Sequence, residues 1–137
     1  MTHLLDHPVI SERYFFPQRV PLDDACRVRS QDLELGCWRS GPPSERPVLL
    51  HFHGNGEVVH HWIDELTPRV QAMGWELFLA EYRGYGASEG QPLLESMLDD
   101  VEAIVDAVAP LFLALFLRGG GLPLLGRDPR LHDGAHP

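Results

Sequence analysis

A short polar loop, His53 to Glu57, carries the residues whose types and spacing could do chemistry. An apolar run leads into this loop, and apolar residues at helical spacing follow it. Gly54 and Gly56 lack a Cβ, so the backbone of the loop can approach a ligand closely. Unpaired backbone N–H groups at the start of a helix favour negative charge. We therefore predict that the loop is a site for a developing negative charge.

Histidines near the loop offer a second chemistry, because imidazoles and a carboxylate together can bind a metal ion. Four of them surround Glu57, namely His51, His53, His60 and His61. The last two are adjacent on a predicted helix and cannot both point inward. We expect His53 to fix the loop through hydrogen bonds and His51 to be a core or sheet-face residue. No metal and no cofactor are therefore expected, and a metal site on this histidine cluster remains the alternative.

A literal serine-hydrolase pattern, G-x-S-x-G, occurs at Gly86 to Gly90 with Ser88 at its centre. In such enzymes the serine lies on a sharp turn directly after a strand. Here the preceding apolar run ends at Tyr82, well before Ser88, and Gly84 also intervenes. We therefore expect Ser88 to satisfy backbone groups in a turn or to cap the next helix, and not to act as a nucleophile.

The elements that must position these residues follow from the spacing of apolar side chains. The runs Pro47 to Phe52 and Trp75 to Tyr82 predict two buried strands. Apolar residues at three- and four-residue spacings predict a helix between them, from Val58 to Val70. Pro68 is expected to break this helix, and Gly74 to end it. Strand, helix and strand together form a βαβ unit.

Further elements are predicted on both sides of this unit. Tyr14 to Phe16 indicates a short aromatic strand or anchor, and Asp32 to Trp38 alternates like a half-buried strand. Pro92 suits the first position of a second helix, which Pro110 is expected to end. The apolar run Leu111 to Leu117 predicts one more buried strand.

Two motifs in this order and spacing resemble the α/β-hydrolase superfamily. The strand ending in His53-Gly54-Asn55-Gly56 is similar to the first oxyanion loop of that family, and Glu81 to Gly90 is similar to the turn after its next strand. Glu81 stands where many relatives carry Asp. The resemblance runs from about Tyr14 to Val108 and implies an α/β fold. Its sheet would be mostly parallel with flanking helices, and its N-terminal strands antiparallel.

The same resemblance implies a function and a site. Relatives of this type hydrolyse ester or amide bonds of small molecules through a serine nucleophile, and Gly54 and Asn55 would belong to the oxyanion hole. The nucleophile is missing where the resemblance places it, after Leu117. The last serine is Ser96, and no Thr or Cys occurs later in the sequence. We therefore expect the chain to be inactive, with a non-catalytic binding module on the same half-sheet as the alternative.

Composition also changes along the chain. Residues 111–137 contain no Glu, Val or Ile, and glycine, proline and arginine are frequent after Leu117. We expect residues 1–110 to be the N-terminal half of an α/β-hydrolase domain. Residues 111–137 would be an apolar strand and a disordered tail, in a sequence truncated or frameshifted near the nucleophile turn. An uncovered edge strand at Leu111 to Leu117 predicts self-association.

Charge and cysteine content exclude several classes of partner. The net charge is −9, all 11 basic residues are Arg, and no basic run occurs. Nucleic acid and anionic membrane surfaces are therefore not expected as partners. Cys26 and Cys37 have neither the number nor the spacing of a disulfide scaffold and indicate a reducing compartment. No secretory leader or membrane span is visible, so we expect a cytoplasmic location.

Overall fold

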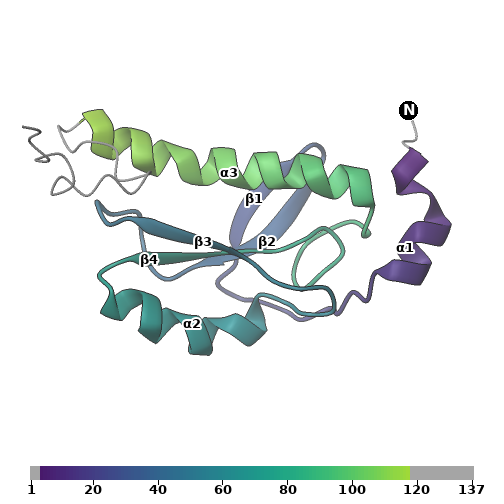
Figure 1. Cartoon of the computed structure of the whole chain (residues 1–137), viewed down its shortest axis with the longest axis horizontal. Coiled ribbons are helices and arrows are strands. Elements are labelled where there is room, and N and C mark those ends of the chain that lie inside the picture. Colours follow the sequence, from purple (N-terminus) through teal and green to yellow (C-terminus); the bar gives the residue numbers. More distant parts are fainter. Residues whose placement is uncertain (1–3, 118–137) are drawn as a thin grey trace, which may run out of the picture.

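The computed structural model of the protein describes residues 4–117, which form three helices, a 3-10 turn and one four-stranded sheet (Figure 1). In chain order the elements are η1 (Leu4–Asp6), α1 (Pro8–Tyr14), β1 (Cys26–Ser30), β2 (Leu33–Arg39), β3 (Val48–Phe52), α2 (His60–Ala72), β4 (Glu76–Ala80) and α3 (Leu94–Leu117). None of the helices in the described residues has the length and apolar character that crossing a bilayer requires.

The sheet is mixed, with strand order β1-β2-β4-β3. β3 and β4 run parallel, with Leu50 opposite Phe78, and they are the two strands of the predicted βαβ unit. β1 pairs antiparallel with β2, and β2 pairs antiparallel with β4. The antiparallel N-terminal strands are thus confirmed, but the expectation of a mostly parallel sheet is wrong for the described residues. The reason is that the segment expected to add a parallel strand is helical.

Helices cover both faces of this sheet, with α3 on one side and α2 on the other (Figure 1). The side chains of β4 pack alternately against α3 and α2, because successive side chains of a strand point to opposite faces of the sheet. Phe78 and Ala80 pack with Ile104 and Val108 on the α3 side. Leu77 and Leu79 pack with Val70 on the α2 side. All five residues of β4 are therefore buried.

Helix α2 runs through Pro68 without the predicted break. Trp62, Ile63 and Leu66 lie before the proline and Val70 after it, and all four pack in one apolar cluster against the sheet. A proline inside a helix costs about 3 kcal/mol, which burial of several large side chains offsets.

The predicted strand at Leu111 to Leu117 is wrong, because this segment is the last part of α3. The helix also continues through Pro110, which was expected to end it. An uninterrupted apolar run does not by itself separate a buried strand from a helix. Leu and Ala are among the best helix formers, and extending an existing helix is easier than starting a new element. The expected edge strand is therefore absent from the described residues, and α3 runs across the predicted boundary between residues 110 and 111. The predicted tail after Leu117 lies outside the described residues.

The N-terminal segment differs from the predicted aromatic strand. Tyr14 is the last residue of α1, and Phe15 follows in an extended conformation as its C-cap. Asp6 accepts hydrogen bonds from the backbone N–H groups of Glu95 and Ser96, at 2.8 and 3.3 Å, and so caps α3. The segment thus lies across the start of α3 (Figure 1). Strand β1 was not predicted, because its two arginines hide the alternation of apolar residues.

Candidate functional site

The loop after β3 is closed by hydrogen bonds of its own. Glu57 Oε2 accepts a hydrogen bond from the Gly54 backbone N–H at 2.8 Å, and the Glu57 backbone N–H donates to the Gly54 carbonyl at 3.2 Å. The Trp62 indole N–H donates to the same Glu57 oxygen at 3.2 Å. Gly56 has a φ of +83°, which glycine adopts without strain. The Gly54 N–H is therefore engaged within the loop.

The side chain of Asn55 fastens the loop to two distant segments. Its Nδ2 donates to the Tyr14 carbonyl at 2.6 Å. Its Oδ1 accepts from the Phe16 backbone N–H at 3.2 Å and from the Tyr85 hydroxyl at 2.7 Å. Among the described residues, no group accepts a hydrogen bond from the Asn55 backbone N–H. The amide side chain thus fixes the loop to the N-terminal segment and to the turn after β4.

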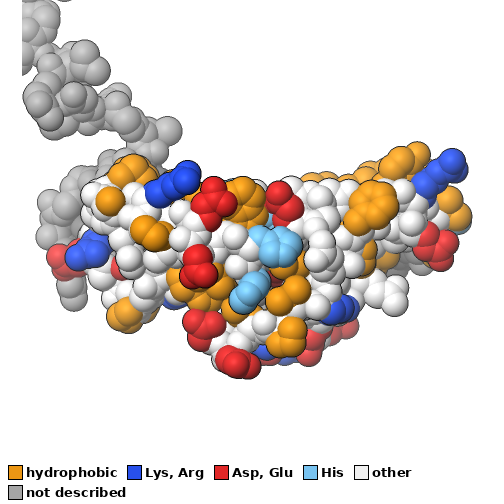
Figure 2. All heavy atoms as spheres, turned by 90° about the horizontal axis from the view of Figure 1, so that it is seen from below, with side chains coloured by type: hydrophobic (Ala, Val, Ile, Leu, Met, Phe, Trp, Pro, Cys, Tyr) orange, Lys and Arg blue, Asp and Glu red, His pale blue; other side chains and the backbone are white. Residues whose placement is uncertain are grey.

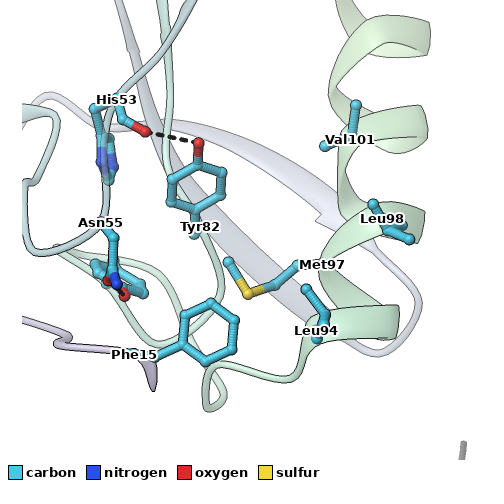
Figure 3. A pocket seen from close by; sticks show the side chains of 9 residues that line it. Phe15, His53, Asn55, Tyr82, Leu94, Met97, Leu98 and Val101 are labelled. Carbon is cyan, nitrogen blue, oxygen red and sulfur yellow. Dashed lines mark hydrogen bonds between the residues drawn. The ribbon is translucent and has the colours of Figure 1, made fainter. Parts of the chain in front are cut away.

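The ring of His53 holds the start of the loop in place. Its Nδ1 lies 2.8 Å from the Gly54 carbonyl oxygen, and its Nε2 lies 2.5 Å from Glu81 Oε1. Burial opposes charge on this ring, yet the hydrogen bonds to Glu81 and Gly54 raise the pKa of His53 above its ordinary value. The Tyr82 hydroxyl donates to the His53 carbonyl at 2.8 Å (Figure 3). The expectation that His53 fixes the loop through hydrogen bonds is confirmed.

A cavity of about 240 Å³ opens where this loop faces the first two turns of α3. Figure 3 shows the apolar side chains of α3 on one side, with Phe15 below and the polar residues of the two loops opposite. The lining residues come from the N-terminal segment, both loops and α3: Phe15, His53, Asn55, Tyr82, Tyr85, Leu94, Met97, Leu98 and Val101. The cavity is therefore mostly apolar, with polar groups only on the loop side.

The electrostatics of this region favour uncharged occupants. Burial raises the pKa of both Tyr82 and Tyr85, so their hydroxyls remain neutral near pH 7. The hydrogen bond from the Gly54 N–H lowers the pKa of Glu57, which lies outside the cavity lining and stays ionised. His53 lines the cavity with both ring nitrogens already engaged. The described residues that line the cavity thus bring no unpaired charge to it.

Three buried serine hydroxyls have hydrogen-bond partners within the fold. Ser88 is buried, and its Oγ accepts a hydrogen bond from the Gly36 backbone N–H at 2.8 Å. Its hydroxyl thus satisfies a backbone group of β2, and not one of its own turn or of the next helix as expected. Ser30 and Ser96 donate to the carboxylates of Asp100 and Asp6, both at 2.5 Å. Burial raises the pKa of Cys37 to about 12, so it remains a thiol. Within residues 4–117, no hydroxyl or thiol forms a hydrogen bond to a histidine ring.

The histidine cluster does not assemble into a metal site. His60 and His61 are exposed at the start of α2, and Figure 2 shows histidines open to solvent beside acidic side chains. The His51 ring instead packs against Trp62, with ring centroids 5.0 Å apart. Within the part of the chain that the structure describes, no group of three or more His, Cys, Asp or Glu side chains could hold a metal ion.

Sequence reasoning found the loop but missed most of the residues around it. Of the two predicted oxyanion-loop residues, Asn55 lines the cavity, whereas Gly54 precedes it in the loop and donates its N–H to Glu57. The contributions of Phe15, Tyr85 and Met97 were not predicted, because these residues approach the loop only through tertiary packing. One usable signal was present, since Tyr82 and Tyr85 are aromatic residues in a glycine-rich turn that follows a buried strand.

Curated relatives match this chain over limited parts of their own length. The α/β hydrolase domain-containing protein WAV2 of Arabidopsis thaliana is 30% identical over 104 residues, which cover 72% of this chain and 34% of the plant protein. Protein bem46 of Schizosaccharomyces pombe is 37% identical over 54 residues, or 39% of this chain and 18% of that protein. Monoglyceride lipase of Mus musculus is 30% identical over 121 residues, or 80% of this chain and 40% of the lipase. No protein-family model and no solved structure matched.

Proposed function

This chain belongs to the α/β-hydrolase superfamily, and from that premise we propose that it forms the oxyanion-loop and ligand-binding half of an ester or amide hydrolase site. The chain spans 18 to 40% of the length of the three relatives described above. We further propose that this chain does not itself catalyse hydrolysis. It acts instead as a binding module for an uncharged small molecule.

The backbone N–H of Asn55 carries this proposal. It lies in a loop that opens onto the cavity, between a strand end and the N-terminal end of α2. Such an N–H favours an oxygen atom that carries partial negative charge. The Gly54 N–H is held by Glu57, so Asn55 is the better candidate of the two oxyanion-loop residues.

The cavity supports a ligand with a small apolar group beside a carbonyl. Leu94, Met97, Leu98 and Val101 form its α3 wall, and burying apolar surface against such a wall contributes about 25 cal/mol per Å². The carbonyl oxygen would then accept a hydrogen bond from Asn55. The net charge of −9 supports an uncharged small ligand over nucleic acid or an anionic membrane.

The proposed lack of catalysis rests on which side chains are free. Ester or amide hydrolysis in this superfamily needs a nucleophile, a histidine base and an acid that orients it. Ser88 is buried and hydrogen-bonded to Gly36, and the ring of His53 is hydrogen-bonded to Glu81 and Gly54.

The free thiols of Cys26 and Cys37 support a reducing compartment such as the cytoplasm as the place where the protein acts.

Ligand binding can be measured with 2-octanone, an unreactive carbonyl compound with an apolar chain. We expect saturable shifts of the Asn55 amide resonance in NMR titrations. Val101→Phe should weaken binding roughly tenfold or more, because the larger ring fills the cavity and displaces several methylene groups. Val105→Phe is the matched control, since Val105 is 43% exposed one turn further along the same helix and does not line the cavity.

Catalysis is tested separately with 4-nitrophenyl butyrate and a serine-directed phosphonate probe. We expect neither turnover nor covalent labelling. Stoichiometric labelling of Ser88 would refute the proposed lack of catalysis. Equal binding by the Val101→Phe and Val105→Phe variants would refute the cavity as the ligand site.

A further inference from the structure

Glu81, at the end of β4, joins three separate segments through one buried carboxylate. Its Oε1 lies 2.5 Å from His53 Nε2 and accepts a hydrogen bond from the Tyr82 backbone N–H at 3.1 Å. Its Oε2 accepts from the Val59 backbone N–H, at the start of α2, at 2.9 Å. Glu81 is 1% exposed, so these contacts are shielded from water. A Cβ at Gly86 would collide with the Glu81 carboxylate, so the absence of a side chain at Gly86 makes space for this carboxylate.

The hydrogen-bond partners determine how many protons the His53 ring carries. The Gly54 carbonyl can only accept, so Nδ1 must carry a proton at 2.8 Å from it. The 2.5 Å contact between Nε2 and Glu81 holds a second proton. Glu81 Oε2 also accepts from the Val59 N–H and Oε1 from the Tyr82 N–H, so both carboxylate oxygens already act as acceptors. The arrangement is therefore that of an imidazolium ion beside a carboxylate.

We propose that Glu81 is a positioning residue: it holds His53 as an imidazolium ion and thereby sets the orientation of the peptide between Gly54 and Asn55, beside the cavity that Asn55 lines. The Nδ1 proton of the ring binds the Gly54 carbonyl, which orients the peptide plane between Gly54 and Asn55. That plane contains the Asn55 N–H. That this peptide orientation matters for ligand binding rests on the proposed function. The state of the ring can be measured without any ligand.

Titratable groups from each neighbouring element face His53. They are Glu81 at the end of β4, Glu57 in the loop, His51 in β3, and Tyr82 and Tyr85 in the turn after β4. The two carboxylates favour a charged ring, and His51 opposes it. Burial lowers the pKa of His51 and raises those of both tyrosines, so these three groups are neutral near pH 7. Glu81 contacts the ring directly, so substitution of Glu81 is the test of what keeps His53 charged.

The pH dependence follows from the direction of the His53 shift. The hydrogen bonds to Glu81 and Gly54 raise the pKa of His53 from its ordinary value of 6.5 despite burial. The contribution of the charged pair to the folded state is then complete below pH 6.5 and is lost as pH rises through the raised value. At a pH above the raised pKa of His53, Nε2 has no proton to share with Glu81. The loop should therefore be less ordered at alkaline pH.

Nitrogen-detected NMR of the histidine side chains tests this directly on the whole chain. In the unaltered protein at pH 7, we expect both ring nitrogens of His53 to carry protons. Glu81→Gln should lower the titration midpoint of His53 by about one pH unit or more, a tenfold loss of proton affinity. It should also move the Asn55 amide resonance. Glu81→Asp retains the carboxylate and should restore a protonated ring.

Glu89→Gln is the matched control, because Glu89 lies in the next turn and accepts one backbone hydrogen bond from Glu34, at 2.8 Å. It should leave the His53 titration unchanged. A neutral His53 ring at pH 7 in the unaltered protein would overturn the inference even if Glu81→Gln fails to fold. A Glu81→Gln protein with an unchanged His53 titration or Asn55 resonance would overturn it as well. Loss of 2-octanone binding with normal His53 behaviour would instead count against the proposed function.

Discussion

At the scale of single residues, Arg83 and Asp100 form a buried ion pair that fastens the turn after β4 to α3. Arg83 Nε and Nη2 donate to the two oxygens of Asp100 at 2.6 and 2.7 Å. Ser30, at the end of β1, donates to the same carboxylate at 2.5 Å. Arg83 is 4% exposed and Asp100 is 1% exposed, so neither charge has access to water as a substitute partner.

Asp100→Asn should therefore destabilise the protein by about 3–5 kcal/mol, because it leaves the Arg83 charge buried and unpaired. Urea unfolding followed by circular dichroism measures this as a lower midpoint. Asp99→Asn is the control, since Asp99 is exposed and bonds to Gln31 at 3.0 Å. That change should stay within about 0.5 kcal/mol of the unaltered protein. Equal effects of the two variants would show that the buried pair is not a special anchor.

At the scale of elements, the strands and helices with a clear local pattern were predictable from the sequence. β3 and β4 lie inside the predicted runs, because uninterrupted apolar residues bounded by turn residues are typical of buried strands. β2 follows from its alternation. The last part of α3 was not predictable in this way, since the same apolar run satisfies a strand and a helix.

The candidate site was predictable only as far as its local loop. His53, Gly54 and Asn55 are adjacent in sequence, so their common location needs no tertiary information. The partners of the Asn55 side chain, Tyr14 and Tyr85, lie 41 and 30 residues away. Sequence periodicity carries no information about such pairings, and the contact between His53 and Glu81, 28 residues apart, was missed for the same reason.

Pro68 gives a test of how helix α2 is held together. It is exposed inside the helix, and it removes the backbone N–H that would otherwise bond to the carbonyl of Asp64. Pro68→Ala should restore that hydrogen bond and stabilise the protein by up to about 3 kcal/mol. Thermal unfolding would register this as a higher midpoint. An unchanged or lower midpoint would indicate that packing of α2 depends on a bend at Pro68.

At the scale of the whole molecule, the two edges of the sheet differ in how they are protected. On one edge, β1 carries the exposed charged side chains of Arg27 and Arg29. On the other edge, β3 pairs only with β4 among the described residues, and it contains no Lys, Arg, Asp, Glu or Pro. Burial lowers the pKa of His51, the one titratable residue of β3, so it is neutral near pH 7. Charged residues on an edge strand oppose pairing with other chains, and β3 lacks them.

The open edge of β3 also has a defined set of backbone groups. The Pro47 carbonyl accepts a hydrogen bond from the Glu76 N–H at 2.8 Å, so it points toward β4. Because backbone groups alternate in direction along a strand, those of Val48, Leu50 and Phe52 point away from β4. A second copy related by a two-fold axis through Leu50 would place Val48 opposite Phe52. Since the expected strand at Leu111 to Leu117 does not form, we propose β3 as the strand for self-association.

We predict that the protein forms dimers or larger species through β3 and that Val48→Lys shifts it toward monomer. A lysine at the start of an edge strand can extend its charge into solvent and so opposes pairing with a second chain. Light scattering over a range of protein concentrations measures the change. Val105→Lys is the control, because it adds the same charge on the exposed surface of α3. Association that Val105→Lys abolishes and Val48→Lys leaves intact would place the contact on α3, and a concentration-independent monomer would refute self-association altogether.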